Sequence, residues 1–353
     1  MGFMLRYLTR VLYSDDIIYL SEGEIPWYRK LTGKQTEIKC LNMRSNTYNE
    51  EKAWKEIQSY LPETNQLRDD ILPEEVYLKS GDYDIHIDRY IQKTPKGVVV
   101  VFHGVGGNGR LLEFIALPLW RSGYEVICPD LPLYGLTVHK GKVSYSDWIR
   151  CGAAVCDSFR RTGTPLFVFG LSAGGMLAYQ VACRIDSVDG ILATCLLDQR
   201  IKRVTRETAS SKMMAVIGKP FLKMSHRLIG NLKLPMKSVC NMKAIVNNEE
   251  LAEILMRDDL SSGARVSLEF LYGMLNPDIQ IEPNDFNKCP VLLVHPAEDR
   301  WTAPELSRLF YDKLCVDKKM VMLPGAGHFP IEKTGLIEFE ISSISFLDNI
   351  VGA

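Results

Sequence analysis

Ser172 lies in a sequence context that favours nucleophilic chemistry. The pentapeptide Gly-Leu-Ser-Ala-Gly, residues 170–174, follows a buried apolar stretch at 165–170 and precedes a helical pattern at 174–185. A serine on such a strand-to-helix turn is strained and presents its hydroxyl at the carboxyl edge of a sheet, and small flanking residues let the strand and helix approach closely. We predict that Ser172 is a nucleophile; the alternative is an ordinary turn of small residues.

Asp299 and His328 are the predicted partners of this serine. A serine hydroxyl is a poor nucleophile near neutral pH, so it needs a base to take its proton and a carboxylate to orient that base. Asp299 follows a buried strand pattern at 289–296, and His328 follows the next strand in a glycine-rich loop. The chain order serine, aspartate, histidine is one in which such triads occur.

Alternatives remain for both partners. Asp299 could cap a helix that begins near residues 303–304, and His328 could be an ordinary loop histidine. Glu298 and Asp198 are alternative acids, but the spacing of Asp299 before residues 301–304 suits a loop that enters a helix. Four other histidines lack such settings, so we expect them to be structural or solvent-exposed. They are His86, His139, His226 and His295, and we expect His295 to lie in the core.

Two backbone amides are candidates for an oxyanion hole. The segment His-Gly-Val-Gly-Gly, residues 103–107, follows an apolar strand pattern and is flexible enough to curl back toward Ser172. The amides of Val105 and Ala173 would then face the oxyanion of a tetrahedral intermediate. A phosphate-binding loop is the alternative, but neither G-x-x-x-x-G-K-[ST] nor a complete G-x-G-x-x-G is present.

Short buried strands alternate with helical patterns from residue 76 onward, which predicts crossover units and a mostly parallel α/β sheet. The alternation stops near residue 196 and resumes near 289. We therefore predict a core formed by 76–195 and 286–353, with a mostly helical insertion at 196–285. Residues 1–75 are predicted to be a mostly helical N-terminal extension, in which residues 49–61 resemble a surface helix and 2–13 allow a short membrane-touching helix.

The overall composition excludes several classes of protein. The 353 residues carry 42 basic and 43 acidic side chains, a net charge of -1, which argues against nucleic-acid binding through a global positive field. The nine cysteines show no C-x-x-C pair or metal-type spacing, which favours reduced thiols and a cytoplasmic protein. No metal or organic cofactor is implied.

The ordered motifs resemble those of serine hydrolases of the α/β-hydrolase superfamily. They are HGVGGNG, PDLPLYGLT, GLSAGG, HPAEDRWTAP and GAGHFP, which span residues 103–330 in the family's order. The resemblance implies an eight-stranded, mostly parallel sheet with a helical cap inserted after the sixth strand, and it is nearest to capped monoacylglycerol lipases and lysophospholipases. One departure is PLYGLT at 132–137, where relatives often have a Gly-His-Gly turn.

The composition of the predicted cap bears on the substrate. Residues 200–243 contain eleven basic side chains and one acid, Glu207, and seven of the thirteen methionines lie in the insertion. Flexible thioethers can line an adaptable apolar cavity, and a basic face suits an anionic headgroup or membrane surface. The alternative is a solvated basic helix pair with methionines that only pack. The methionines are Met213, Met214, Met224, Met236, Met242, Met256 and Met274.

The predicted function is hydrolysis of a small-molecule carboxylic ester, with an acyl chain, through an acyl-enzyme. The same residues would serve a thioesterase, an amidase or peptidase, or an acyltransferase, because these reactions share the triad and oxyanion hole. A binding protein that keeps the fold without turnover is a further alternative, which the filled triad positions disfavour. The oligomeric state is left open by the sequence.

Overall fold

The computed structural model describes residues 37–40, 47–209, 222–224, 226 and 229–352. The helix considered at residues 2–13 lies outside this part of the chain, as do several basic and methionine residues of the predicted cap. Within the described residues, no helix is both long and apolar enough to span a bilayer. The eight cysteines whose side chains are described form no disulfide.

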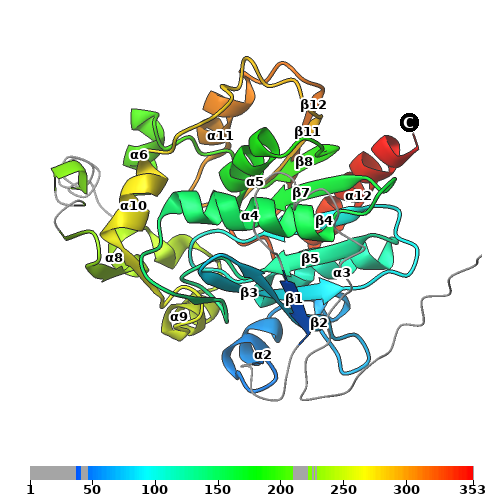
Figure 1. The fold of residues 1–353 in the computed structure, drawn as a ribbon, viewed down its shortest axis with the longest axis horizontal. Coiled ribbons are helices and arrows are strands. Elements are labelled where there is room, and N and C mark those ends of the chain that lie inside the picture. Colours follow the sequence, from blue (N-terminus) through cyan, green and yellow to red (C-terminus); the bar gives the residue numbers. More distant parts are fainter. Residues whose placement is uncertain (1–36, 41–46, 210–221, 225, 227–228, 353) are drawn as a thin grey trace, which may run out of the picture.

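A ten-stranded sheet forms the centre of the molecule (Figure 1). Its order is β1-β2-β3-β5-β4-β7-β8-β11-β12, and the short β6 pairs with β3 outside this path. The strands are β1 (Glu37–Cys40), β2 (Glu74–Ser80), β3 (Tyr83–Tyr90), β4 (Val98–Phe102), β5 (Glu125–Pro129), β6 (Val138–His139), β7 (Leu166–Gly170), β8 (Gly190–Ala193), β11 (Val291–Pro296) and β12 (Lys318–Leu323).

The α/β-hydrolase fold and mostly parallel sheet are confirmed. Strands β5, β4, β7, β8, β11 and β12 run parallel to one another. Strands β2 and β3 form the expected antiparallel hairpin, and β3 is also antiparallel to β5. Every residue of β4 and β7 is buried, as strands covered on both faces require. Eight strands match the expected set, and β1 and β6 are two short additions that the sequence patterns did not indicate.

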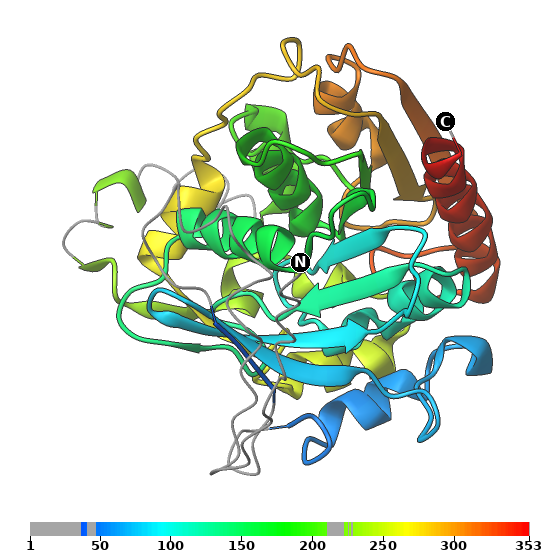
Figure 2. The same cartoon turned by 45° about the vertical axis from the view of Figure 1, so that its right-hand side comes forward.

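Helices cover both faces of the sheet. The N-terminus of α4 is fixed by a capping box of Ser144 and Asp147, which satisfies amides that have no partner inside the helix. Figure 2 shows α12 on the opposite side of the sheet from α4 and α5. The helices that flank the sheet are α3 (Glu113–Arg121), α4 (Tyr145–Phe159), α5 (Ala173–Arg184), α11 (Pro304–Tyr311) and α12 (Lys333–Val351).

The insertion between β8 and β11 lies at one end of the sheet (Figure 1). Its α10 packs on α4, where the rings of Trp148 and Phe270 lie 4.8 Å apart between centroids. Besides helices it contains a small two-stranded sheet, so it is not purely helical. Its elements are α6 (Lys202–Thr208), β9 (Lys233–Pro235), α8 (Met236–Val239), α9 (Glu249–Arg257), β10 (Arg265–Ser267) and α10 (Leu268–Leu275).

The described part of the N-terminal extension differs from the expected mostly helical segment. It contains β1, the six-residue α2 (Ala53–Gln58) and one 3-10 turn (Glu63–Asn65), and the remainder is irregular. The helix predicted at 49–61 is shorter than its apolar spacing indicated, and Trp54 and Ile57 are buried rather than on a free surface. The extension therefore contributes side chains to the main core.

Candidate active site

Ser172 occupies a strained turn between β7 and α5. Its φ of 55° and ψ of -123° lie in a region that residues with a Cβ rarely adopt. The turn is possible because its two flanking glycines leave no room for larger residues: a Cβ on Gly170 would lie 2.0 Å from the Gly174 carbonyl oxygen, and one on Gly174 would lie 2.4 Å from that of Phe102. The Ser172 amide donates to Thr194 Oγ1 at 2.8 Å, which fixes the turn further.

His328 reaches Ser172 from the loop after β12. Its Nε2 lies 2.7 Å from the Ser172 hydroxyl oxygen, and its ring is almost completely buried. The Trp301 indole packs against the imidazole, with the two ring centroids 4.7 Å apart. The amide of Phe329 donates to the Ile245 carbonyl at 2.8 Å and so ties the loop to the insertion. The imidazole is therefore held in place on both sides.

Asp299 completes a chain of short contacts. Its Oδ2 lies 2.7 Å from His328 Nδ1 and accepts a 2.7 Å hydrogen bond from the Thr302 hydroxyl. Its Oδ1 accepts from the amides of Trp301 and Thr302, both at 2.8 Å. Burial alone would raise the pKa of this carboxyl, but the neighbouring imidazole and the hydrogen bonds lower the pKa of Asp299 to about 2.

The other acids considered from the sequence do not reach the imidazole in this way. Asp198 accepts from the Arg200 guanidinium, which also pairs with Glu282. Glu298 is exposed on the surface. The helix-cap alternative for Asp299 also differs from what is observed, because α11 begins after Ala303 and Asp299 instead closes a turn onto residues 301 and 302.

The loop at residues 103–107 lies directly against the serine. A Cβ on Gly104 would lie 2.9 Å from the Ser172 Cβ and 3.2 Å from the Ala173 amide nitrogen. Among the described residues, no acceptor pairs with the amide of Val105 or Ala173. Donors for an oxyanion must be free of other acceptors, so the absence of a described acceptor is compatible with the predicted role of these two amides.

The turn at 132–137, where the sequence departs from its relatives, lies behind this loop. Leu133 and Gly135 have positive φ values of 84° and 57°. A glycine is required at 135 because a Cβ there would overlap the Asp130 carboxylate. The Tyr134 ring packs edge-on against His103, whose Nε2 accepts from the Leu131 amide at 2.9 Å. Residues 131–134 therefore pack against His103, at the start of the predicted oxyanion loop.

A mostly apolar cavity of about 260 Å³ opens at Ser172. Its walls come from both the core and the insertion, and no carboxylate is among its described lining residues. Of the insertion methionines that the structure describes, only Met274 lines it; Met236 and Met242 are packed in the core and Met224 is exposed. The expectation that methionines form the cavity is therefore wrong for Met224, Met236 and Met242. Leucines are the most frequent residue type in the described wall: Leu197, Leu222, Leu234, Leu268, Leu271 and Leu275.

Three residues that hold the site were not identified from the sequence. Thr194 anchors the Ser172 amide, Thr302 donates to Asp299, and Trp301 covers His328 while its indole donates to the Thr208 carbonyl at 3.1 Å. Trp301 and Thr302 follow Asp299 within three residues, and an aspartate commonly accepts hydrogen bonds from residues just after it in a turn. This spacing could have identified both residues from the sequence. No local signal marks Thr194, which is brought to Ser172 by the pairing of β7 with β8.

Two groups of described side chains bring three possible metal ligands together. One consists of Cys195, Asp299 and His328; the other consists of Glu75, His86 and Asp88. In the first group, the histidine contacts the aspartate through one ring nitrogen and Ser172 through the other. In the second, the Arg110 guanidinium already pairs with both carboxylates and supplies the positive charge that a cation would bring. Neither set resembles a dedicated metal centre.

Known proteins share this architecture. Residues 93–332 match the family described as serine aminopeptidase, S33. Phospholipase YtpA of Bacillus subtilis (strain 168) is 28% identical over 215 residues, which cover 58% of this chain and 77% of that protein.

Two solved structures show the same fold. A monoacylglycerol lipase from Paleococcus ferrophilus has a TM-score of 0.61 and 23% identity, covering 76% of this chain and 99% of its own. A soluble variant of monoglyceride lipase from Saccharomyces cerevisiae, in complex with a substrate analogue, has a TM-score of 0.65 and 18% identity, covering 82% and 98%. Because the family match spans more than half of the chain, the protein is a hydrolase of the α/β-hydrolase fold that belongs to the serine aminopeptidase S33 family.

Proposed function

We propose that the protein is a serine esterase that hydrolyses carboxylic esters with an apolar acyl group. The observation that carries this proposal is the chain of contacts from Ser172 through His328 to Asp299 at the mouth of the apolar cavity. A neutral imidazole can accept the serine proton at Nε2 while it donates from Nδ1 to the carboxylate. These are the roles that activation of a serine hydroxyl requires.

The proposed reaction has two steps. Ser172 Oγ attacks the ester carbonyl as His328 takes its proton, and the Val105 and Ala173 amides stabilise the resulting oxyanion. His328 then gives the proton to the leaving alcohol, which leaves the acyl group on the serine. A water that is deprotonated by the same imidazole hydrolyses this acyl-enzyme and restores the free hydroxyl.

The cavity supports an acyl chain rather than a peptide amino terminus. An aminopeptidase must bind a charged ammonium group, for which a buried carboxylate is the usual partner. The described cavity wall offers none. Leucine side chains beside Ser172 instead remove a hydrocarbon chain from water, a transfer of about 0.8 kcal/mol for each buried CH₂ group.

A substrate panel tests this function. Purified protein is assayed on short- and long-chain p-nitrophenyl esters, a monoacylglycerol, a lysophospholipid and an aminoacyl naphthylamide, with product identification and Ser172→Ala as the control. We expect ester hydrolysis that favours long acyl chains and is lost in Ser172→Ala. Cleavage of the naphthylamide alone, or unchanged hydrolysis in Ser172→Ala, would contradict the proposal.

The position of the acyl chain can be tested by filling the cavity. Met274→Trp adds bulk to the wall, so we expect kcat/KM on long-chain esters to fall about tenfold while short-chain esters are hydrolysed as before. Met322→Trp makes the same change at an exposed site on β12 and serves as the control. Equal losses on short and long chains would show that the acyl group lies elsewhere.

We also propose a peripheral contact with anionic lipid at the insertion. Met224, Ile229 and Leu232 are exposed apolar residues, with exposed fractions of 76%, 44% and 51%, in a segment that also exposes Lys223 and Lys233. The apolar side chains would enter the lipid interface while the lysines pair with anionic headgroups, and both contacts would bind the protein to the membrane. Co-sedimentation with vesicles that contain phosphatidylserine, but not with phosphatidylcholine alone, is expected; equal binding to both would exclude the charge contribution.

A further inference from the structure

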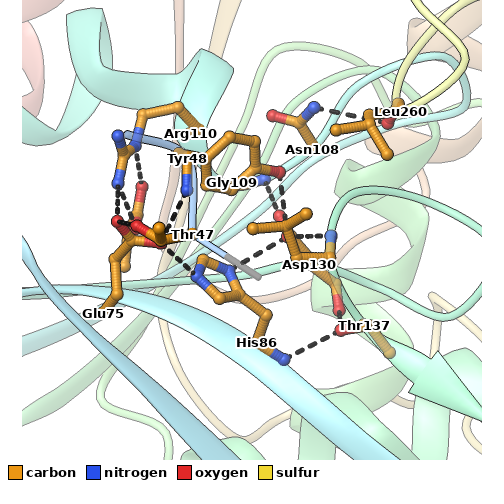
Figure 3. A network of polar contacts seen from close by, with 12 residues as sticks. Thr47, Tyr48, Glu75, His86, Asn108, Gly109, Arg110, Asp130, Thr137 and Leu260 are labelled. Carbon is orange, nitrogen blue, oxygen red and sulfur yellow. Dashed lines mark hydrogen bonds and ion pairs between the residues drawn. The ribbon is translucent and has the colours of Figure 1, made fainter. Parts of the chain in front are cut away.

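Tyr48, in the N-terminal extension, is joined to a buried network of charged groups (Figure 3). Its hydroxyl donates to Asp130 Oδ2 at 2.9 Å, and its amide donates to Glu75 Oε2 at 3.1 Å. Its ring lies over the Arg110 guanidinium, 4.7 Å from ring centroid to the guanidinium carbon. Tyr48 is 1% exposed, so the extension reaches into the interior at this point.

Asp130 is the hub of the network. Its Oδ1 accepts from the Gly109 amide at 2.6 Å, and its Oδ2 accepts from the Leu136 amide at 2.7 Å as well as from Tyr48. The carboxylate is fully buried, at the end of β5. A buried carboxylate with several donors fixes the backbone segments that supply them. Here those segments are Gly109, two residues after the predicted oxyanion loop at 103–107, and the turn at 132–137.

His86 carries the positive charge that balances this hub. Its Nδ1 lies 3.0 Å from Asp130 Oδ2, and its Nε2 lies 2.9 Å from Glu75 Oε2. Each ring nitrogen therefore lies within 3.0 Å of a carboxylate oxygen, although only Nε2 makes a hydrogen bond, and two neighbouring carboxylates favour the imidazolium form, which carries a proton on each nitrogen. Tyr48 and Glu75 in turn enclose this side of the imidazolium.

The oxyanion loop is anchored to the same region at its other end. His103 Nε2 accepts from the Leu131 amide at 2.9 Å, and the Gly107 amide donates to the Gly104 carbonyl at 3.3 Å within the loop. With Gly109 held by Asp130, residues 103–109 are fixed at both ends by residues 130–131. A shift of Asp130 would be passed to the Val105 amide through a loop of only a few residues.

We infer that Tyr48 is a positioning residue for the oxyanion loop, acting through the Asp130 carboxylate and the His86 imidazolium. The inference rests on the proposed esterase function, because it assigns the supported loop to oxyanion binding. It gives the N-terminal extension a part in the reaction, although none of its described residues touches Ser172. Tyr48 supplies one hydrogen bond, to Asp130, and one ring, which packs on Arg110.

The substitution Tyr48→Phe removes the hydroxyl and keeps the ring over Arg110. We expect kcat on a good ester to fall about tenfold while KM changes less than about twofold, since a small displacement of an oxyanion donor acts on the transition state. Affinity for a trifluoromethyl ketone, whose adduct places an oxyanion in the hole, should fall by the same factor as kcat. A merely structural role would leave that affinity unchanged.

A matched control is Tyr124→Phe. The Tyr124 hydroxyl also donates to a carboxylate, Asp348 Oδ1 at 2.6 Å, but on α12 and away from the serine. We expect it to leave kcat and inhibitor affinity unchanged, whatever its effect on thermal unfolding. Equal kinetics of Tyr48→Phe and wild type, or equal losses in both variants, would overturn the inference.

Two further measurements separate the possible failures. If the wild-type chain hydrolyses no ester, the proposed function fails. Hydrogen exchange of the 103–109 amides still tests whether Tyr48 positions this loop. Faster exchange in Tyr48→Phe than in Tyr124→Phe supports that role, and equal exchange refutes it. If Tyr48→Phe does not fold, Thr47→Val removes the neighbouring bond to Glu75 Oε1, and we expect a smaller fall in kcat. An unchanged kcat there would refute the inference.

Discussion

Two buried histidines in this molecule each contact an aspartate, and they differ in what lies on the other side of the ring. His328 has Asp299 at one nitrogen and the Ser172 hydroxyl at the other, both at 2.7 Å. His86 has Asp130 at one nitrogen and Glu75 at the other. A serine hydroxyl has a proton that it can give to the imidazole, whereas an ionised carboxylate has none to give and instead favours the charged imidazolium. The neighbour opposite the aspartate therefore decides whether a histidine can transfer protons or serves as a fixed charge.

The electrostatics of the second pair follow from its surroundings. Burial alone would lower the pKa of His86, but Asp130 and Glu75 outweigh it and raise the pKa of His86 to about 10. Burial would raise the pKa of Glu75, but His86, Arg110 and Thr47 lower the pKa of Glu75 to about 2. Near neutral pH this cluster is a set of paired charges.

The largest expected effect comes from removing His328, the histidine that we propose transfers the serine proton. His328→Ala should lower kcat by about a million-fold, because the serine loses the base on which its attack depends. Steady-state hydrolysis of a p-nitrophenyl ester measures this loss. His139→Ala, which alters a partly exposed imidazole bonded to the Gly141 carbonyl, should retain wild-type activity. Substantial turnover by His328→Ala would remove the distinction between the two histidines.

The two aspartates should respond differently to the same isosteric change. In Asp299→Asn, the new amide group can face the Thr302 hydroxyl and His328 Nδ1, both of which can become acceptors, while the remaining oxygen keeps the amides of Trp301 and Thr302. The fold should survive, but the imidazole would be held in the wrong tautomer. We expect kcat to fall about ten-thousand-fold with little change in thermal unfolding.

Asp130→Asn has no orientation that satisfies its hydrogen-bond partners in this way. One oxygen of Asp130 accepts from the Gly109 amide and the other from the Leu136 amide, so either orientation sets a side-chain N–H against a backbone N–H. His86 would also lose one of its two compensating charges. We expect a loss of about 3–5 kcal/mol in the free energy of unfolding, measured by urea denaturation. Similar stability losses in Asp130→Asn and Asp299→Asn would contradict the comparison.

A smaller effect is expected from alkaline pH. The pKa of His86 in the folded protein, about 10, lies above the ordinary histidine pKa of 6.5. The stabilisation from His86 is therefore fully present below pH 6.5 and is lost as the pH rises through about 10. The loss should be on the order of a few kcal/mol in the free energy of unfolding. Asp88 and Arg110 also face this cluster, and Tyr48 and Tyr77 contact the ring.

Urea unfolding of wild type and His86→Gln from about pH 7 to about pH 11 measures this contribution. The difference between the two chains isolates the histidine from the tyrosines and lysines that titrate in the same range. We expect wild type to lose more stability than the variant as the pH rises. Parallel curves would show that His86 is not a fixed charge in the folded state.

The sequence was informative where chemistry is tied to local geometry. The turn at Ser172 and the loops that hold Asp299 and His328 follow strand ends, so short motifs sufficed to predict three residues that the structure brings together. The order of buried strands likewise predicted the parallel sheet. Such features depend on neighbours within a few residues, which a single sequence displays.

The network around His86 has no such local signature. Tyr48 and Asp130 are 82 residues apart. His86 lies on a strand whose alternating pattern indicates partial exposure, but the rings of Tyr48 and Tyr77 pack against its imidazole. Arg110 is almost completely buried although a basic residue is usually placed on the surface. These contacts arise from strand pairing and chain packing, so they became visible only in three dimensions.

Mass spectrometry of the covalently labelled protein tests the nucleophile most directly. The chain is treated with a fluorophosphonate, digested, and the modified peptide is sequenced, with Ser172→Ala and His328→Ala treated in parallel. We expect one adduct on Ser172 in the wild-type chain, none in Ser172→Ala and strongly slowed labelling in His328→Ala. Stoichiometric labelling of a different residue, or no labelling of folded wild-type protein, would contradict the assignment of Ser172 as the reactive serine.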